Sequence, residues 1–191
     1  EMMWQYLQNH RWQFYSRTEL KEEKSKDIST WSLEKLHAEI SKRYRASVDA
    51  KTEGILKATK LDGFDAIIIK GENTRYLRPT LYDFLAFRAL DYFMTDERDI
   101  TKPAYQFTIN DVAAFAAANE FVKHRFTTKD SASLQHRAIE LLQDILQWHM
   151  ADTRKDALLD ADLIRLNFVY QHAINENKAT LYEAALKNIE E

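Results

Sequence analysis

LRPTLYDFLAFRALDYF, residues 77–93, carries the clearest helix signal in the chain. Thr80 and Asp83 have the spacing of a capping box, with an aspartate as the acidic partner. Pro79 suits a first helical turn, because it lacks an amide hydrogen that such a turn would leave unpaired. The residues that then recur at helical spacing are Leu81, Phe84, Leu85, Arg88, Tyr92 and Phe93. The stretch therefore predicts a helix that begins near Thr80 and has one mainly apolar face.

The same apolar periodicity extends to both sides of this stretch. The predicted helices cover residues 2–15, 33–48 with an extension to 56, 62–69, 110–122, 134–148, 156–170 and 181–189. The predicted caps or first residues are Ser29 or Thr30, Asp62, Asn110, Asp130 or Ser131, and Asp156. The fold class expected from this pattern is all-α, in one helical domain spanning residues 1–191.

The run Ile67-Ile68-Ile69 leaves a second interpretation open. Three consecutive β-branched residues also suit a strand, for which residues 105–109 are the possible partner. We favour a short helix capped by Asp62 and ended by Gly71, because a lone strand has no ladder partner.

The composition supports long helices joined by few loops. The 191 residues include only 3 Gly and 2 Pro, although 45% are hydrophobic and 12% aromatic. Tight turns need Gly and Pro, so their scarcity disfavours a sheet-rich fold. The last three predicted helices have short connections, which place neighbours antiparallel. We expect helical hairpins in an irregular α-solenoid or bundle, similar to a tetratricopeptide array but without its repeat signature.

Several function classes are excluded or disfavoured by the residues present. The chain has no cysteine, so disulfides, thiolate metal sites and cysteine nucleophiles are excluded. A net charge of −3 gives no general attraction for nucleic acid. No apolar run is long enough to span a bilayer, so we expect no membrane insertion by this segment.

Catalytic and metal-binding patterns are also missing. Glu34 and His37 form a Glu-x-x-His pair, whereas a di-iron bundle needs two such pairs and two further glutamates. There is no Gly-x-Ser-x-Gly elbow and no glycine-rich phosphate loop. We therefore expect no catalytic residue, no cofactor and no metal ligand, and we predict that the chain is not an enzyme.

Two groups of residues are candidates for an interaction surface. The aromatic group is Trp12, Phe14 and Tyr15, and the basic group before Pro79 is Lys70, Arg75 and Arg78. The structural alternative is that the aromatic side chains belong to the core and that Arg78 braces its loop by binding carbonyl groups. For Arg88 we expect a partly buried guanidinium paired with Asp91 or Asp162.

Five stretches, taken in order, resemble one known family. They are EMMWQYLQNHRWQFYSRT at 1–18, DISTWSLEKLHAEISKRY at 27–44, LRPTLYDFLAFRALDYF at 77–93, NEFVKHRFTTKDSASLQHRAIELLQDILQWHM at 119–150 and DALLDADLIRLNFVYQHA at 156–173. Together they resemble the helical N-terminal region of the large alpha-2-macroglobulin family proteins of Bacteroidetes. The resemblance implies an exported, cell-envelope parent with macroglobulin-type β-domains downstream, and relatives of that class trap proteases. It assigns no binding residue to this chain.

The predicted function is that of a non-catalytic helical scaffold or interaction domain. Because the helical pattern is already under way at Glu1, we expect a fragment of a much larger protein. Its expected partners are other domains of the parent chain or a separate protein, with weak self-association through any seam that excision exposes. The alternative is a stand-alone α-solenoid that binds a peptide or protein in an aromatic groove.

Overall fold

The computed structural model describes residues 1–14, 26–69, 71–96 and 103–190. The α-helices of this part of the chain are α1 (Met2–Phe14), α2 (Leu33–Ser47), α3 (Ala50–Ala58), α4 (Leu81–Phe93), α5 (Ala118–Phe121), α6 (Leu134–His149), α7 (Asp156–His172) and α8 (Lys178–Glu190). Short 3-10 helices lie between them: η1 (Ile28–Thr30), η2 (Leu61–Phe64), η3 (Arg75–Leu77) and η5 (Val112–Phe115). The described residues form no strand, so the all-α prediction is confirmed.

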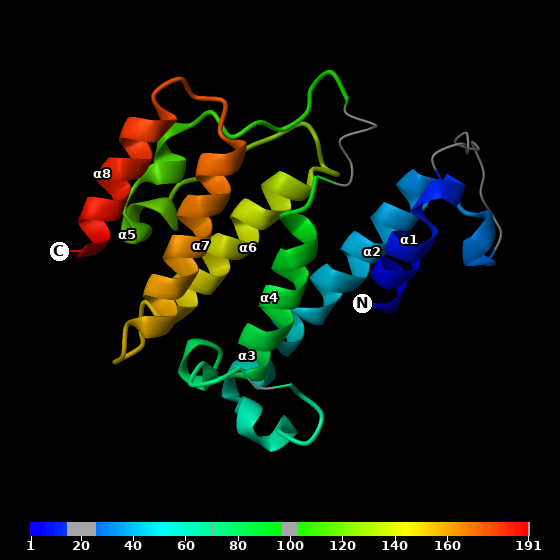
Figure 1. Cartoon of the computed structure of the whole chain (residues 1–191), viewed down its shortest axis with the longest axis horizontal. Coiled ribbons are helices and arrows are strands. Elements are labelled where there is room, and N and C mark those ends of the chain that lie inside the picture. The colour runs from blue at the N-terminus through cyan, green and yellow to red at the C-terminus, as the bar shows by residue number, and fades with distance from the viewer. Residues whose placement is uncertain (15–25, 70, 97–102, 191) are drawn as a thin grey trace.

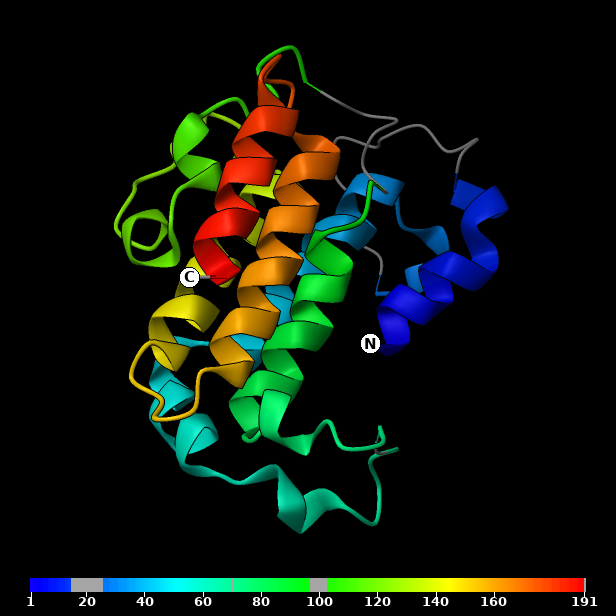
Figure 2. The same ribbon diagram turned by 60° about the vertical axis from the view of Figure 1, so that its left-hand side comes forward.

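The long helices lie side by side in nearly chain order (Figure 1). The packed neighbours are α1 with α2, α2 and α3 with α4, α4 with α6, α6 with α7, and α7 with α8. The view turned by 60° shows α8 running alongside α7, in agreement with their packing (Figure 2). This arrangement fits the expected irregular bundle or solenoid, with α1 at one end of the molecule and α8 at the other.

The helix starts follow local side-chain chemistry. The Thr80 hydroxyl accepts from the Asp83 amide, while the Asp83 carboxylate accepts from the Thr80 amide, so the predicted capping box is confirmed. Pro79 precedes this cap instead of lying in the first turn. The predicted start at Asp156 is also confirmed.

Asp62 lies inside η2 and caps no helix. Three further predicted caps are also wrong. Ser29 and Thr30 lie in η1, and Ser32 caps α2 instead. Ser133, not Asp130 or Ser131, caps α6, and Asp111, not Asn110, caps η5. In each case several capping residues stand close together in the sequence, and the helix begins at the last of them because the apolar face starts directly after it.

The predicted helix over residues 62–69 is replaced by η2 and a series of turns. Ile67 and Ile69 are 81% and 99% exposed, so no packed face stabilises a helix there. The alternative strand at residues 67–69 is not formed either. Ile109, from the segment considered as its partner, makes an isolated bridge with Ala173 instead. Helices this short depend on tertiary packing, and this segment receives little.

The core is a single cluster that reaches from α1 to α8. Its N-terminal part is built around Tyr92 of α4, which is fully buried. The ring of Tyr92 lies 5.1 Å from that of Trp4 on α1 and 5.3 Å from that of Tyr44 on α2. Its hydroxyl is 2.8 Å from Nδ1 of His37 on α2. One side chain of α4 thus holds α1 and α2 together.

The buried side of α4 agrees with the prediction only at Tyr92 and Phe93. The structure buries Tyr82, Ala86, Ala89 and Leu90 together with Tyr92 and Phe93. Leu81, Phe84 and Leu85 are only partly buried, and Arg88 is exposed. Because α4 has α2, α3 and α6 as neighbours, the side that faces them is buried, although its alanines give a weaker sequence signal than the leucines beside it.

We predict that Leu142→Ala lowers the free energy of unfolding by about 2–5 kcal/mol, because Leu142 of α6 is fully buried. Leu85→Ala should cost less than about 2 kcal/mol, since a partly buried side chain loses less apolar contact. Urea unfolding of both variants measures the difference. Equal losses would contradict this assignment of the core.

Candidate interaction site

One charged cluster, Asp83–His149–Asp152, joins two helices. Nε2 of His149 lies 3.0 Å from Oδ1 of Asp83, and Nδ1 lies 2.7 Å from Oδ2 of Asp152. Both ring nitrogens therefore face carboxylate acceptors, an arrangement that suits the doubly protonated imidazolium. Asp83 and His149 are both fully buried. The cluster connects the start of α4 to the end of α6 and leaves no histidine nitrogen available for catalysis.

The electrostatics of His149 agree with this geometry. Burial opposes the charged form, but the hydrogen bonds to Asp83 and Asp152 outweigh it and raise the pKa of His149 above its ordinary value. His149 also lies in the last turn of α6, where a cation interacts favourably with the helix dipole.

A second buried ion pair fixes η5 against α7. Nε of Arg165 donates to Oδ1 of Asp162 at 2.7 Å, and Nη1 donates to the carbonyl oxygen of Ala114 at 2.7 Å. The guanidinium also lies over the ring of Phe121, 4.6 Å from its centroid. Burial raises the pKa of Asp162 and lowers the pKa of Arg165, so each charge depends on the other for its stability. Through the hydrogen bond to Ala114, Arg165 holds η5 against α7.

Metal-binding geometry is not found in the described ranges 1–14, 26–69, 71–96 and 103–190, where no group of three or more His, Asp or Glu residues is placed to hold an ion. His37, of the Glu34–His37 pair, is buried and faces Tyr92. Likewise, no helix in the described ranges is both long and apolar enough to cross a bilayer.

The predicted aromatic surface is not brought together as one face. Trp12 is 73% exposed, whereas Phe14 is 1% exposed and packs edge-on against Tyr6, with ring centroids 6.1 Å apart. The prediction for Phe14 is therefore corrected: it belongs to the core. Tyr15 lies outside the described residues.

The predicted basic group acts mainly within the loop before α4. Nη2 of Arg75 binds Oδ1 of Asp65 at 2.5 Å, and Nη2 of Arg78 binds Oδ2 of Asp160 at 2.6 Å. Arg78 also donates to the carbonyl oxygen of Leu77, as in the structural alternative. Lys70 lies outside the described residues. These two arginines hold the loop against itself and against α7.

Arg88 does not form the predicted internal brace. Its Nη1 lies 3.7 Å from Oε1 of Glu1, and the two side chains are 50% and 42% exposed. The partner is thus the first residue of the chain, not Asp91 or Asp162. An ion pair this exposed contributes little to stability.

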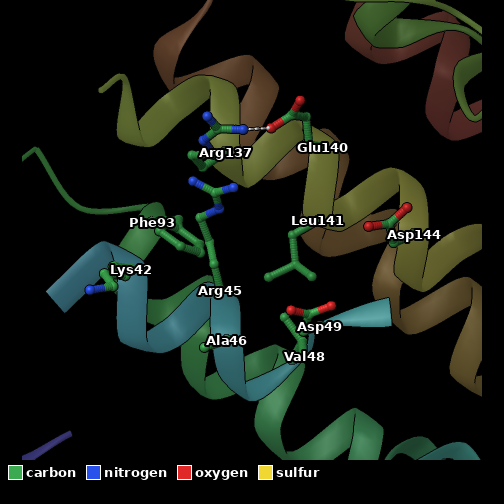
Figure 3. A pocket seen from close by; sticks show the side chains of 10 residues that line it. All are labelled: Lys42, Arg45, Ala46, Val48, Asp49, Phe93, Arg137, Glu140, Leu141 and Asp144. Atoms are coloured by element: carbon green, nitrogen blue, oxygen red, sulfur yellow. Dashed lines mark hydrogen bonds and ion pairs between the residues drawn. The ribbon is translucent and has the colours of Figure 1, made fainter. Parts of the chain in front are cut away.

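Sequence reasoning missed a pocket of about 470 Å³ between α2, α4 and α6 (Figure 3). Its charged lining comprises Lys42, Arg45, Asp49, Arg137, Glu140 and Asp144. The apolar lining comprises Ala46, Val48, Phe93 and Leu141. Its volume falls in the usual range of ligand sites, roughly 300–1,000 Å³. No sequence motif marks this site, because its residues come from α2, the junction of α2 and α3, α4 and α6, which meet only in the folded chain.

We predict that His149→Gln lowers the free energy of unfolding most at acidic pH. A raised folded-state pKa adds stability that is complete below the unfolded pKa of about 6.5, and this stability is lost as pH rises through the folded pKa. The stability difference between wild type and His149→Gln should therefore shrink as pH increases above about 6.5. Urea unfolding across this range tests it.

The variant Asp152→Asn serves as the control for this assignment. It removes one of the two carboxylates that raise the pKa of His149, so the loss of stability should begin at a lower pH than in wild type. A difference between wild type and His149→Gln that stays constant with pH would refute the assignment.

We also predict that Arg165→Ala lowers the free energy of unfolding by about 3–5 kcal/mol, because it leaves the buried Asp162 without a partner. The double change Arg165→Met with Asp162→Leu should recover most of this loss, since no isolated charge remains buried. Denaturant unfolding of both variants provides the measurement. If the double variant is less stable than the single one, the pair is not an isolated structural unit.

In comparisons with known proteins, no family model, no curated protein and no solved structure matches the chain.

Proposed function

We propose that this chain is a non-catalytic helical scaffold domain whose role is to bind protein through an apolar face of α7. The observation that carries the proposal is the second apolar side of that helix. Leu159, Leu163 and Tyr170 are 41%, 40% and 37% exposed. Their spacing of four and seven residues places them along one side of a helix.

The buried side of α7 is already complete without these residues. Its core contacts come from Ala157, Ala161, Leu166, Phe168 and Val169. An apolar arc wider than the core requires is typical of a helix that receives a further partner. When another surface covers such a row of leucines, the free energy falls by about 25 cal/mol per Å² of apolar area removed from water.

Helix α8 covers part of this side. The rings of Tyr170 and Tyr182 stack with centroids 4.6 Å apart, and the Tyr182 hydroxyl donates to Oδ1 of Asn167 at 2.6 Å. Leu159 and Leu163, nearer the start of α7, remain two-fifths exposed despite α8. These two leucines are therefore the centre of the proposed docking face.

The contacts of the buried ionisable groups support a non-catalytic role. Catalytic groups with shifted pKa values usually face a cleft where a substrate can reach them. Three of the groups with shifted pKa values, His149, Asp162 and Arg165, are buried, and their bonds go to other parts of the same fold. We accordingly propose that the chain has no enzymatic activity of its own.

The sequence resemblance extends the proposal to the parent protein. We propose that the partner of the α7 face is another domain of an exported, envelope-associated protein of the alpha-2-macroglobulin type. The open reading frame that contains these 191 codons tests this part directly. Macroglobulin-like β-domains encoded downstream would support it, and a frame without them would remove it.

We predict that the photoreactive residue p-benzoylphenylalanine, placed at position 163 of the full-length protein in its source cells, cross-links to one defined surface. The physical reason is that Leu163 lies at the centre of the proposed face. Mass spectrometry of the cross-linked peptides identifies the contact. Leu159→Asp in the same chain should abolish it, because a carboxylate in that row opposes apolar docking.

The matched control position is Lys187 of α8, whose side chain is 68% exposed and pairs with Glu183. Circular dichroism of Leu159→Asp verifies that the variant is folded. Equal cross-linking from positions 163 and 187 would overturn the proposal.

A further inference from the structure

We infer that the pocket between α2, α4 and α6 binds a short peptide segment in which an apolar side chain stands between one acidic and one basic residue. In this mode the acid pairs with Arg45, the base pairs with Asp144, and the apolar side chain covers Leu141. The inference rests on the proposed protein-binding function and assigns it a second site with a stated chemistry.

The cationic end of the pocket carries an arginine with no internal partner. Within the described residues, the Arg45 guanidinium makes no ion pair or hydrogen bond, although it extends from α2 toward Arg137 (Figure 3). Arg137, by contrast, donates to Glu140 at 2.5 Å and to the carbonyl oxygen of Ser131 at 3.3 Å. Arg45 is thus the cation at this end that is available to bind a carboxylate.

The anionic end carries a carboxylate in a similar position. Asp144 of α6 lies on the other side of Leu141 from Arg45 (Figure 3), and it makes no ion pair or hydrogen bond with the residues that the structure describes. Although the residue as a whole is exposed, surrounding protein desolvates its carboxyl and raises its pKa, and the charges of Glu53 and Glu140 raise it further. Lys57 acts against this shift, but its ammonium already pairs with Glu53. A basic group from outside would relieve this unfavourable charge.

The surface between the two charges is apolar and rigid. Phe93 and Leu141 are 2% and 6% exposed and are held by the core, so they present a fixed base to a ligand. Val48 is partly buried at the junction of α2 and α3. One aliphatic side chain can cover this base and exclude water from it.

The charge balance decides between classes of ligand. The pocket has three basic and three acidic lining residues, so its formal charge is zero. A phosphate, a nucleic acid or a uniformly acidic peptide would meet as many repulsive groups as attractive ones. A ligand with one charge of each sign, separated by an apolar group, matches the lining at both ends.

The test is an NMR titration of the 191-residue chain with the capped tripeptide Ac-Glu-Leu-Lys-NH2. We expect saturable shifts of the Ala46, Val48 and Leu141 amides. The tripeptides Ac-Glu-Leu-Glu-NH2, Ac-Lys-Leu-Lys-NH2 and Ac-Gly-Leu-Gly-NH2 retain the leucine, and each should bind more weakly because at least one charge match is lost.

Variants of the chain separate charge recognition from folding. Arg45→Gln and Asp144→Asn should each weaken binding of Ac-Glu-Leu-Lys-NH2 about two- to fivefold, the effect of removing one exposed ion pair. The matched control Arg43→Gln, on the same helix but outside the pocket, should leave binding unchanged. Arg45→Glu should reverse the preference, so that Ac-Lys-Leu-Lys-NH2 binds better than Ac-Glu-Leu-Lys-NH2.

The inference is overturned if Ac-Glu-Leu-Lys-NH2 gives no saturable shifts at the pocket, or if the four tripeptides bind equally well. It also fails if Arg45→Glu leaves the preference unchanged in a variant that circular dichroism shows to be folded. Cross-linking from position 163 does not depend on this pocket, so a negative titration beside a positive cross-link removes the pocket assignment alone.

Discussion

Burial of α4 against α2, α3 and α6 is the constraint on which the other helices depend. The two ends of α4 are held differently. At the N-terminal end, Asp83 closes the capping box with Thr80 and also binds His149 of α6. Near the C-terminal end, Tyr92 contacts Trp4 and Tyr44, and its hydroxyl lies close to His37. The Asp83–His149 ion pair at one end and aromatic packing at the other fix the position of α4 among its neighbours.

The buried charges of this chain specify which elements meet. Removing two charges from water is costly, so a buried pair is favourable only when its hydrogen bonds are nearly complete. Asp83–His149 and Asp162–Arg165 meet this condition, because the remaining donors reach Asp152 and the carbonyl oxygen of Ala114. A helix arrangement that slipped by one turn would separate Asp83 from His149 and Arg165 from the carbonyl oxygen of Ala114.

The two proposed binding surfaces differ in physical character and in place. The row of Leu159, Leu163 and Tyr170 on α7 is apolar and partly covered by α8, which suits a broad contact with another folded surface. The pocket between α2, α4 and α6 has opposed charges around a small apolar base, which suits a short segment. Helix α6 packs against both α4 and α7 and lies between the two surfaces (Figure 1).

Local sequence signals were enough to predict the all-α class, the Thr80–Asp83 capping box, the start of α7 and the approximate spans of most long helices. These features follow from spacing within a few residues, where periodicity and capping act. The packing of the helices against one another sets which side of α4 is buried, that Phe14 is internal, and that Arg88 faces Glu1. It also decided the contact between Asp83 and His149, which are 66 residues apart, and the meeting of Arg45 and Asp144 around Leu141. Such choices depend on which helices become neighbours, and no pattern within a single helix encodes that.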